Sequence, residues 1–242
     1  MQGWVSMLNS FRVDAGVEVV VAPPSVWVDR VRRGLRDDFG VGVQDVCADG
    51  FGAHTGEVAA AMGRHVGADF AIVGHSERRA KGETDADCAV KAQRVQEEGM
   101  QGILCVGETL EEREGGRTLE VVMRQLEAYN GGVGKEWGDF VVAYEPVWAI
   151  GTGKVATPTQ VQEVHQGIRG WFQANVGQDA ADAVRVIYGG SVKGENSAEL
   201  ARLDDVDGFL VGGASLEPQF QDIINARGGK ATSGPIRVGI NG

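Results

Sequence analysis

The sequence predicts an α/β protein in which short parallel strands alternate with longer helices. Seven brief apolar runs fit strands buried on both faces, at residues 17–22, 40–44, 70–73, 102–106, 140–144, 184–188 and 208–211. Stretches of helical length separate them, at residues 26–39, 59–66, 85–98, 119–129, 159–175, 198–203 and 219–226. Such alternation predicts crossover connections, in either a doubly wound sheet or a closed barrel that is one strand short of eight.

The first expected element is a helix rather than a strand. Residues 2–11 place Trp4, Val5, Leu8 and Phe11 at helical spacing. The chain is therefore expected to open inside a helix.

Length and composition favour one compact domain of enzyme size. The chain has 242 residues, of which 43% are hydrophobic and 24% charged. Its net charge of -11 argues against nucleic acid and anionic membrane surfaces as partners. Cys47, Cys88 and Cys105 show no C-x-x-C spacing, which is typical of free thiols in a reducing compartment. No metal site or cofactor is expected.

Two strand ends carry candidate catalytic side chains. His75 follows the run at 70–73 and opens a short polar helix, where it could polarise a carbonyl group. Glu145 ends the run at 140–144 and precedes a loop with proline at its start and glycines near its end, which is typical of a base beneath a closing lid. The alternative interpretations are a helix-capping histidine and an ordinary glutamate before a surface loop.

Glycine pairs follow the last two expected strands, at 189–190 and 212–213. Paired glycines allow backbone N–H groups to approach an anion, and phosphate sites recur after strands 7 and 8 of barrels. Tight turns without a ligand are the alternative interpretation. The Gly153–Lys154 pair is not a phosphate-binding P-loop, because Val155 stands where Ser or Thr is required.

These features coincide with a family resemblance over residues 4–226. The motifs are Ala-Pro-Pro-Ser at 22–25, Gly-Ala-His-Thr-Gly-Glu at 52–57, Gly-His-Ser-Glu-Arg-Arg at 74–79, Cys-Val-Gly-Glu at 105–108, Ala-Tyr-Glu-Pro-Val-Trp-Ala-Ile-Gly-Thr-Gly-Lys at 143–154, Tyr-Gly-Gly-Ser-Val at 188–192 and Phe-Leu-Val-Gly-Gly-Ala-Ser-Leu at 209–216. In order and spacing they resemble triosephosphate isomerase. The resemblance implies a (β/α)8 TIM barrel and the interconversion of dihydroxyacetone phosphate and glyceraldehyde 3-phosphate, a reaction of glycolysis and gluconeogenesis.

The resemblance also implies residue roles. Glu145 would be the carbon base and His75 a neutral electrophile, an arrangement that is a standard example of pKa tuning. Glu77 would support them as a partly buried carboxylate. The substrate phosphate would bind Gly151, Ser191, Gly212 and Gly213. The lid would comprise Pro146, Val147, Trp148, Ala149, Ile150, Gly151, Thr152, Gly153 and Lys154.

One family feature has no counterpart before Gln2, namely a first strand whose Asn and Lys face the substrate. The lysines of this chain, Lys81, Lys91, Lys135, Lys154, Lys193 and Lys230, match other regions or none. Loss of a fixed cation beside the enediolate should cost about 3 to 4 kcal/mol of transition-state stabilisation, by analogy with one oxyanion donor. Weak activity is therefore expected, and a catalytically silent barrel that binds phosphate or a partner subunit is the alternative.

The C-terminal segment differs from the family. Residues 228–234 have the composition of a linker, and residues 235–242 resemble the first strand of glyceraldehyde-3-phosphate dehydrogenase, cut within its glycine-rich turn. We therefore expect a barrel over residues 1–227 and a fused fragment over 228–242, without an NAD site. The segment either fills the vacant strand position, with Asn241 at the substrate, or stays disordered and leaves apolar strand edges that promote aggregation.

Partners and location follow from the resemblance and composition. The family forms homodimers in which the loop at residues 50–57 inserts into the second subunit, although a missing first strand would disturb this contact. A cytoplasmic location is expected, or a mitochondrial one if a transit peptide preceded the sequence.

Overall fold

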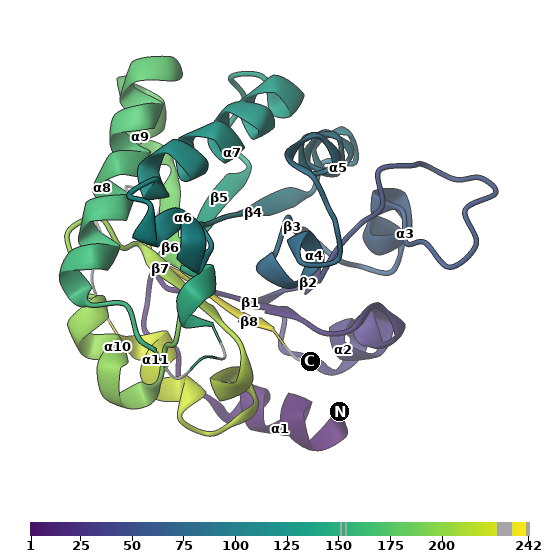
Figure 1. Cartoon of the computed structure of the whole chain (residues 1–242). Coiled ribbons are helices and arrows are strands. Elements are labelled where there is room, and N and C mark those ends of the chain that lie inside the picture. The colour runs from purple at the N-terminus through teal and green to yellow at the C-terminus, as the bar shows by residue number, and fades with distance from the viewer. Residues whose placement is uncertain (151, 153, 227–233, 241–242) are drawn as a thin grey trace.

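The computed structural model describes residues 1–150, 152, 154–226 and 234–240. Within these ranges, eight parallel strands close into a barrel in chain order, and the helices surround it (Figure 1). The strands are β1 (Glu18–Ala22), β2 (Phe39–Val43), β3 (Phe70–Val73), β4 (Gln101–Val106), β5 (Phe140–Tyr144), β6 (Arg185–Tyr188), β7 (Gly208–Val211) and β8 (Ile236–Ile240). A closed β/α barrel is therefore confirmed and a doubly wound sheet is excluded.

The expected count of seven strands is one too few, because the C-terminal segment forms β8. This strand pairs with β1 from Glu18 opposite Ile236 to Ala22 opposite Ile240, and it also pairs with β7. The inserted-strand alternative is thus confirmed for residues 236–240, whereas Asn241 lies outside the described residues. The expectation of unpaired edges at β1 and β7 is wrong, because β8 forms backbone hydrogen bonds with both strands.

Alternating side chains along β8 face two different layers. Ile236 and Val238 are fully buried among the apolar side chains inside the barrel. Arg237 points outward and is 1% exposed, because its guanidinium lies 4.7 Å from the centre of the Phe209 ring and donates to the Ile223 carbonyl at 2.9 Å. Gly208 of β7 permits this close pairing, since an added Cβ there would lie 1.9 Å from the Ile236 carbonyl oxygen.

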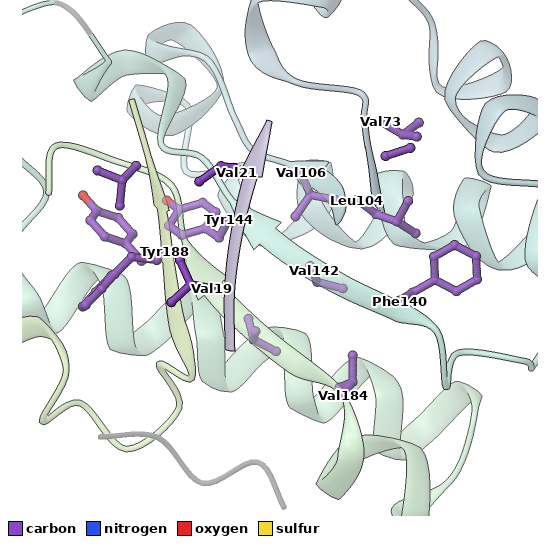
Figure 2. Close-up of a cluster of buried hydrophobic side chains, with 14 of the residues drawn as sticks. Val19, Val21, Val73, Leu104, Val106, Phe140, Val142, Tyr144, Val184 and Tyr188 are labelled. Carbon is purple, nitrogen blue, oxygen red and sulfur yellow. The ribbon is translucent and has the colours of Figure 1, made fainter. Parts of the chain in front are cut away.

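The larger hydrophobic layer lies between the barrel and the helices. Figure 2 shows side chains of this layer from several strands, among them Val19 and Val21 of β1. Val20 between them belongs to the inner layer. This period of two explains why barrel strands are apolar along their whole length, since both faces are covered.

The helices and 3-10 turns of the described residues are α1 (Gln2–Ser10), η1 (Ser25–Trp27), α2 (Val28–Gly34), α3 (Ala60–His65), α4 (Ser76–Arg79), α5 (Asp85–Glu97), α6 (Leu110–Glu114), α7 (Thr118–Val133), η2 (Val147–Ala149), α8 (Pro158–Asn175), α9 (Gln178–Ala183), α10 (Gly194–Leu200), η3 (Gly213–Leu216) and α11 (Phe220–Asn225). Local sequence fixes the start of the longer ones: a capping box at Thr84 begins α5, and Thr157 with Pro158 begins α8. The expected helix at 26–39 is shorter and divided between η1 and α2. No helix among the described residues is long and apolar enough to cross a membrane.

Candidate active site

His75 and Glu145 meet at the end of the barrel where the strands have their C-termini, which we call the mouth. His75 follows β3 and Glu145 follows β5. The His75 Nε2 atom lies 3.1 Å from Glu145 Oε1. The Glu145 side chain is 2% exposed and that of His75 is 19% exposed, so the pair is accessible from the imidazole side.

The imidazole of His75 is oriented by the backbone of the next turn. Its Nδ1 atom accepts a hydrogen bond from the Glu77 backbone N–H at 3.3 Å. An accepting Nδ1 carries no proton, so in the neutral ring the proton lies on Nε2. The Nε2–H bond therefore points toward Glu145 Oε1, and a substrate carbonyl could accept it in place of that carboxylate.

The Glu145 carboxylate is held by the start of α4. Ser76 donates its backbone N–H to Glu145 Oε2 at 3.0 Å and its hydroxyl to Oε1 at 3.1 Å. Burial nevertheless raises the pKa of Glu145 above its usual value, against the opposing influence of His75 and of the Ser76 hydrogen bonds. A carboxylate with a raised pKa is a stronger base than an exposed one, as proton abstraction from carbon requires.

Glu77 is more exposed than expected. Its side chain is exposed, although the motif at 74–79 suggested a partly buried carboxylate. Successive residues of a helix point about 100° apart, so the turn that directs Ser76 to Glu145 directs Glu77 outward. Glu77 does line the cavity beside His75.

A buried glutamate anchors the lid segment. Glu108 is fully buried after β4, and its Oε1 accepts the indole N–H of Trp148 at 2.9 Å. Arg113 and the hydroxyl of Tyr144 also donate to this carboxylate, at 3.1 Å each. Glu108 belongs to the motif at 105–108 but was not among the predicted site residues, although its position directly after a strand is typical of residues at the mouth.

The glycine pairs of the two last loops differ in their surroundings. A Cβ at Gly212 or Gly213 would meet nothing within 4 Å, so these two backbones border open space. A Cβ at Gly189 would lie 2.9 Å from Glu145 Cγ, and one at Gly190 would lie 2.1 Å from the Tyr188 hydroxyl. Gly212 and Gly213 therefore leave room beside the backbone, whereas Gly189 and Gly190 make room for the side chains of Glu145 and Tyr188.

These features enclose one cavity of about 640 Å³. Its lining includes His75, Glu145, Ser191, Gly212 and Gly213, which the structure thus brings together. In the lid segment, Ile150 lines the cavity, and the Ala149 carbonyl accepts the Ser191 hydroxyl at 3.4 Å. The predicted positions 151 and 153 lie outside the described residues.

The fold and this cavity define a β/α-barrel protein with a buried carboxylate and an imidazole at its mouth. Comparison with known proteins identifies the family: residues 2–227 match triosephosphate isomerase. The chain is 50% identical over 225 residues to triosephosphate isomerase of Emericella nidulans, covering 92% of this chain and 90% of that protein. It is also 50% identical over 224 residues to each of the chloroplastic triosephosphate isomerases of Arabidopsis thaliana and Fragaria ananassa, covering 92% of this chain and 71% of each relative. The chain belongs to the triosephosphate isomerase family, whose reaction interconverts dihydroxyacetone phosphate and glyceraldehyde 3-phosphate.

Proposed function

We propose that Glu145 and His75 carry the family reaction in this chain, with Glu145 as the carbon base and His75 as the neutral electrophile. The observation that carries this proposal is the 3.1 Å contact between the buried carboxylate and the imidazole at the mouth. A coupled assay of purified chain, measuring conversion of each triose phosphate into the other, tests it. Absence of turnover in both directions would contradict it.

The geometry suggests how the two groups would divide the work. Bound substrate would replace the 3.1 Å contact between His75 Nε2 and Glu145 Oε1, and Glu145 would remove a proton from the carbon beside the carbonyl group. The His75 Nε2–H group donates to the carbonyl oxygen, where negative charge develops in the enediolate. Glu145 then returns the proton to the neighbouring carbon. The His75 Nε2 atom gives its proton to the former carbonyl oxygen and takes the proton of the former hydroxyl, which completes the exchange of carbonyl and hydroxyl.

We assign phosphate binding to the backbone N–H groups of Ser191, Gly212 and Gly213, together with Gly151, which lies outside the described residues. The support is that the described members of this set line the cavity that contains Glu145 and His75. Open space beside the two glycines is what an anion close to the backbone requires.

Gly213→Ala provides a sharp test of this assignment. The added methyl group meets no protein atom within 4 Å, so folding should be preserved, but the methyl would occupy space next to the bound phosphate. We expect KM to rise about tenfold or more, since one charge-assisted hydrogen bond contributes about 1.5 to 3 kcal/mol. Steady-state kinetics measure the effect, and Gly131→Ala, at an exposed position of α7, is the matched control. Unchanged KM in a folded Gly213→Ala variant would contradict the assignment.

We propose that residues 146–154 form the lid that excludes water from the reaction. Trp148 holds this segment through its hydrogen bond to Glu108, and its ring lies 4.8 Å from the Arg113 guanidinium carbon. Thr152 adds an internal bond, because its hydroxyl donates to the Trp148 carbonyl at 2.8 Å.

Trp148→Phe should loosen the lid without unfolding the barrel. The phenyl ring retains the contact with Arg113 but cannot donate to the buried Glu108 carboxylate. Loss of a hydrogen bond to a charged group corresponds to about 1.5 to 3 kcal/mol, so limited proteolysis within residues 146–154 should accelerate about tenfold or more. Trp27→Phe, at an exposed site outside the lid, serves as control. Equal cleavage rates for the two variants would exclude Trp148 as the anchor.

Asn241, the residue expected at the position of the family's first-strand Asn, lies outside the described residues. Ile240, the last residue of β8, lines the cavity beside His75 and Gln44. Among the described residues that line this cavity, Lys193 is the one lysine or arginine. It directly follows the loop at residues 189–192, to which we assign part of the phosphate site. Because no other described lysine or arginine lines this cavity, we expect slow turnover. The alternative, a silent barrel, would bind phosphate without isomerising the substrate.

We further propose that the homodimer of the family uses the loop at residues 50–57. This segment extends away from the barrel before α3 (Figure 1), and its Phe51 side chain is 72% exposed. Light scattering would test the assembly, and a Phe51→Ser variant should shift it toward the monomer.

We propose that residues 228–242 are a linker and the start of a dehydrogenase-like segment fused to a barrel over 1–227. The pairing of β8 within the barrel gives this segment a structural role in the present chain.

We also propose a cytoplasmic location, supported by the three buried free cysteines, although two of the relatives named above are chloroplastic. Fractionation with an antibody to the barrel would test the location.

A further inference from the structure

The first helix and the last strand are linked by one buried serine. The indole N–H of Trp4 in α1 donates to the Ser215 carbonyl at 2.9 Å, and the Ser215 hydroxyl donates to the Ile240 carbonyl at 2.9 Å. Ser215 is fully buried in η3. The two hydrogen bonds connect α1 to the mouth end of β8, although the elements lie at opposite ends of the sequence.

The direction of α1 follows from contacts near its end. The Asn9 side chain donates to the Gly34 carbonyl at 2.8 Å and accepts the Arg36 backbone N–H at 2.9 Å, at the end of α2. Asn225, at the end of α11, donates to the Arg12 carbonyl at 3.0 Å. Helices that follow barrel strands end opposite the mouth, so α1 also runs from the mouth to the far end.

This position and direction are those of a helix that follows β8. In a β/α barrel, each strand is covered by the helix that runs back beside it. Figure 1 shows α1 between α2, which follows β1, and α11, which follows β7. We infer that α1 is the outer helix of β8, forming with it a β/α unit that lacks a direct covalent connection and is held together at the mouth through Ser215.

The fit around Ser215 makes this contact specific. An added Cβ at Gly239 would lie 3.0 Å from both Ser215 Cβ and Phe220 Cζ, so β8 lies closely against η3 and α11. Trp4 is 9% exposed, and its N–H group would lose a buried partner if η3 moved. The stability of β8, and with it the position of Ile240 in the catalytic cavity, therefore depends on α1.

Amide hydrogen exchange of the full chain tests this dependence. Trp4→Phe keeps most of the ring volume but removes the N–H group that bonds Ser215. Trp137→Phe is the matched control, because that indole donates to Asn130 Oδ1 at 3.0 Å and is 4% exposed. Mass spectrometry would follow exchange over residues 236–240 and over β4 in both variants.

We expect Trp4→Phe to accelerate exchange in residues 236–240 about tenfold, as loss of one buried hydrogen bond implies, with a much smaller change in β4. Trp137→Phe should leave residues 236–240 within about twofold of the parent. Equal acceleration by both variants, or none by Trp4→Phe, would overturn the inference. Neither readout requires catalytic activity.

A rearranged chain provides a second test. Residues 234–242 are moved in front of Met1 and joined to it by a short glycine-serine linker, so that β8 directly precedes α1. We expect this chain to fold as the same barrel and to melt no lower than the parent, because the covalent link raises the effective concentration of the two elements. A rearranged chain that melts well below the parent with every linker of about 3 to 10 residues, up to roughly 35 Å when extended, would overturn the inference.

Discussion

Replacing Glu145 with glutamine is expected to lower kcat by about 10²- to 10⁴-fold, the contribution typical of a positioned general base. Glutamine keeps the size of the side chain and can still contact His75 and Ser76, but it cannot take a proton from carbon. Coupled assays of the parent and the variant measure the loss. Glu217→Gln, an exposed change at the same cavity, is the control. Equal kcat for the parent and Glu145→Gln would exclude Glu145 as the base.

The raised pKa of Glu145 extends this prediction to pH. The base must be ionised, so kcat/KM of the parent should fall with decreasing pH through an apparent pKa above 4.5, the ordinary value for glutamate. Because the folded pKa is raised, this carboxyl contributes stability below pH 4.5 that is lost as the pH rises through the folded pKa. Glu145→Gln should therefore be more stable than the parent near neutral pH, with the difference vanishing below about pH 4.5. Steady-state assays at several pH values measure the first trend, and urea denaturation over the same pH range measures the second.

The alternation of strands and helices could be predicted from local sequence because the strands are apolar on both faces and the helices have clear starts. The run at 140–144 became β5 with the expected bounds, since each of its residues is buried. Catalytic candidates were found by the same reasoning, because side chains that follow parallel strands converge at one end of the barrel. His75 and Glu145 therefore came together as the strand ends suggested.

Other features depended on tertiary contacts that local patterns do not contain. Ile236–Ile240 carries a charged residue at its second position, and the preceding glycine-rich residues are typical of a linker. Arg237 is buried because carbonyl groups at the end of α11 accept its N–H groups and the Phe209 ring covers it. Arg237 meets the Ile223 carbonyl and the Phe209 ring because β8 lies between β1 and β7. Likewise, the roles of Ser76 and Glu77 depend on which face of a four-residue helix points inward.

The second large effect is expected at β8, where Val238→Asp should destabilise the whole barrel. Val238 is fully buried inside the barrel, opposite Val20 of β1 and Leu210 of β7. An aspartate there would bury an uncompensated charge, which typically costs about 3 to 5 kcal/mol. The strand must then carry that cost or leave the barrel, and leaving would remove backbone partners from both β1 and β7.

Urea denaturation followed by circular dichroism measures this effect, and two further variants define its cause. Val26→Asp adds the same charge at a side chain that is 85% exposed and should change the free energy of unfolding by no more than about 0.5 kcal/mol. Val238→Ala removes two methyl groups without adding charge and should cost about 1.5 to 3 kcal/mol. A disordered C-terminal segment would make all three variants equivalent to the parent. Graded losses at position 238, with none at position 26, require that β8 is an integral strand of the barrel, because only a strand enclosed on both sides makes a carboxylate there costly.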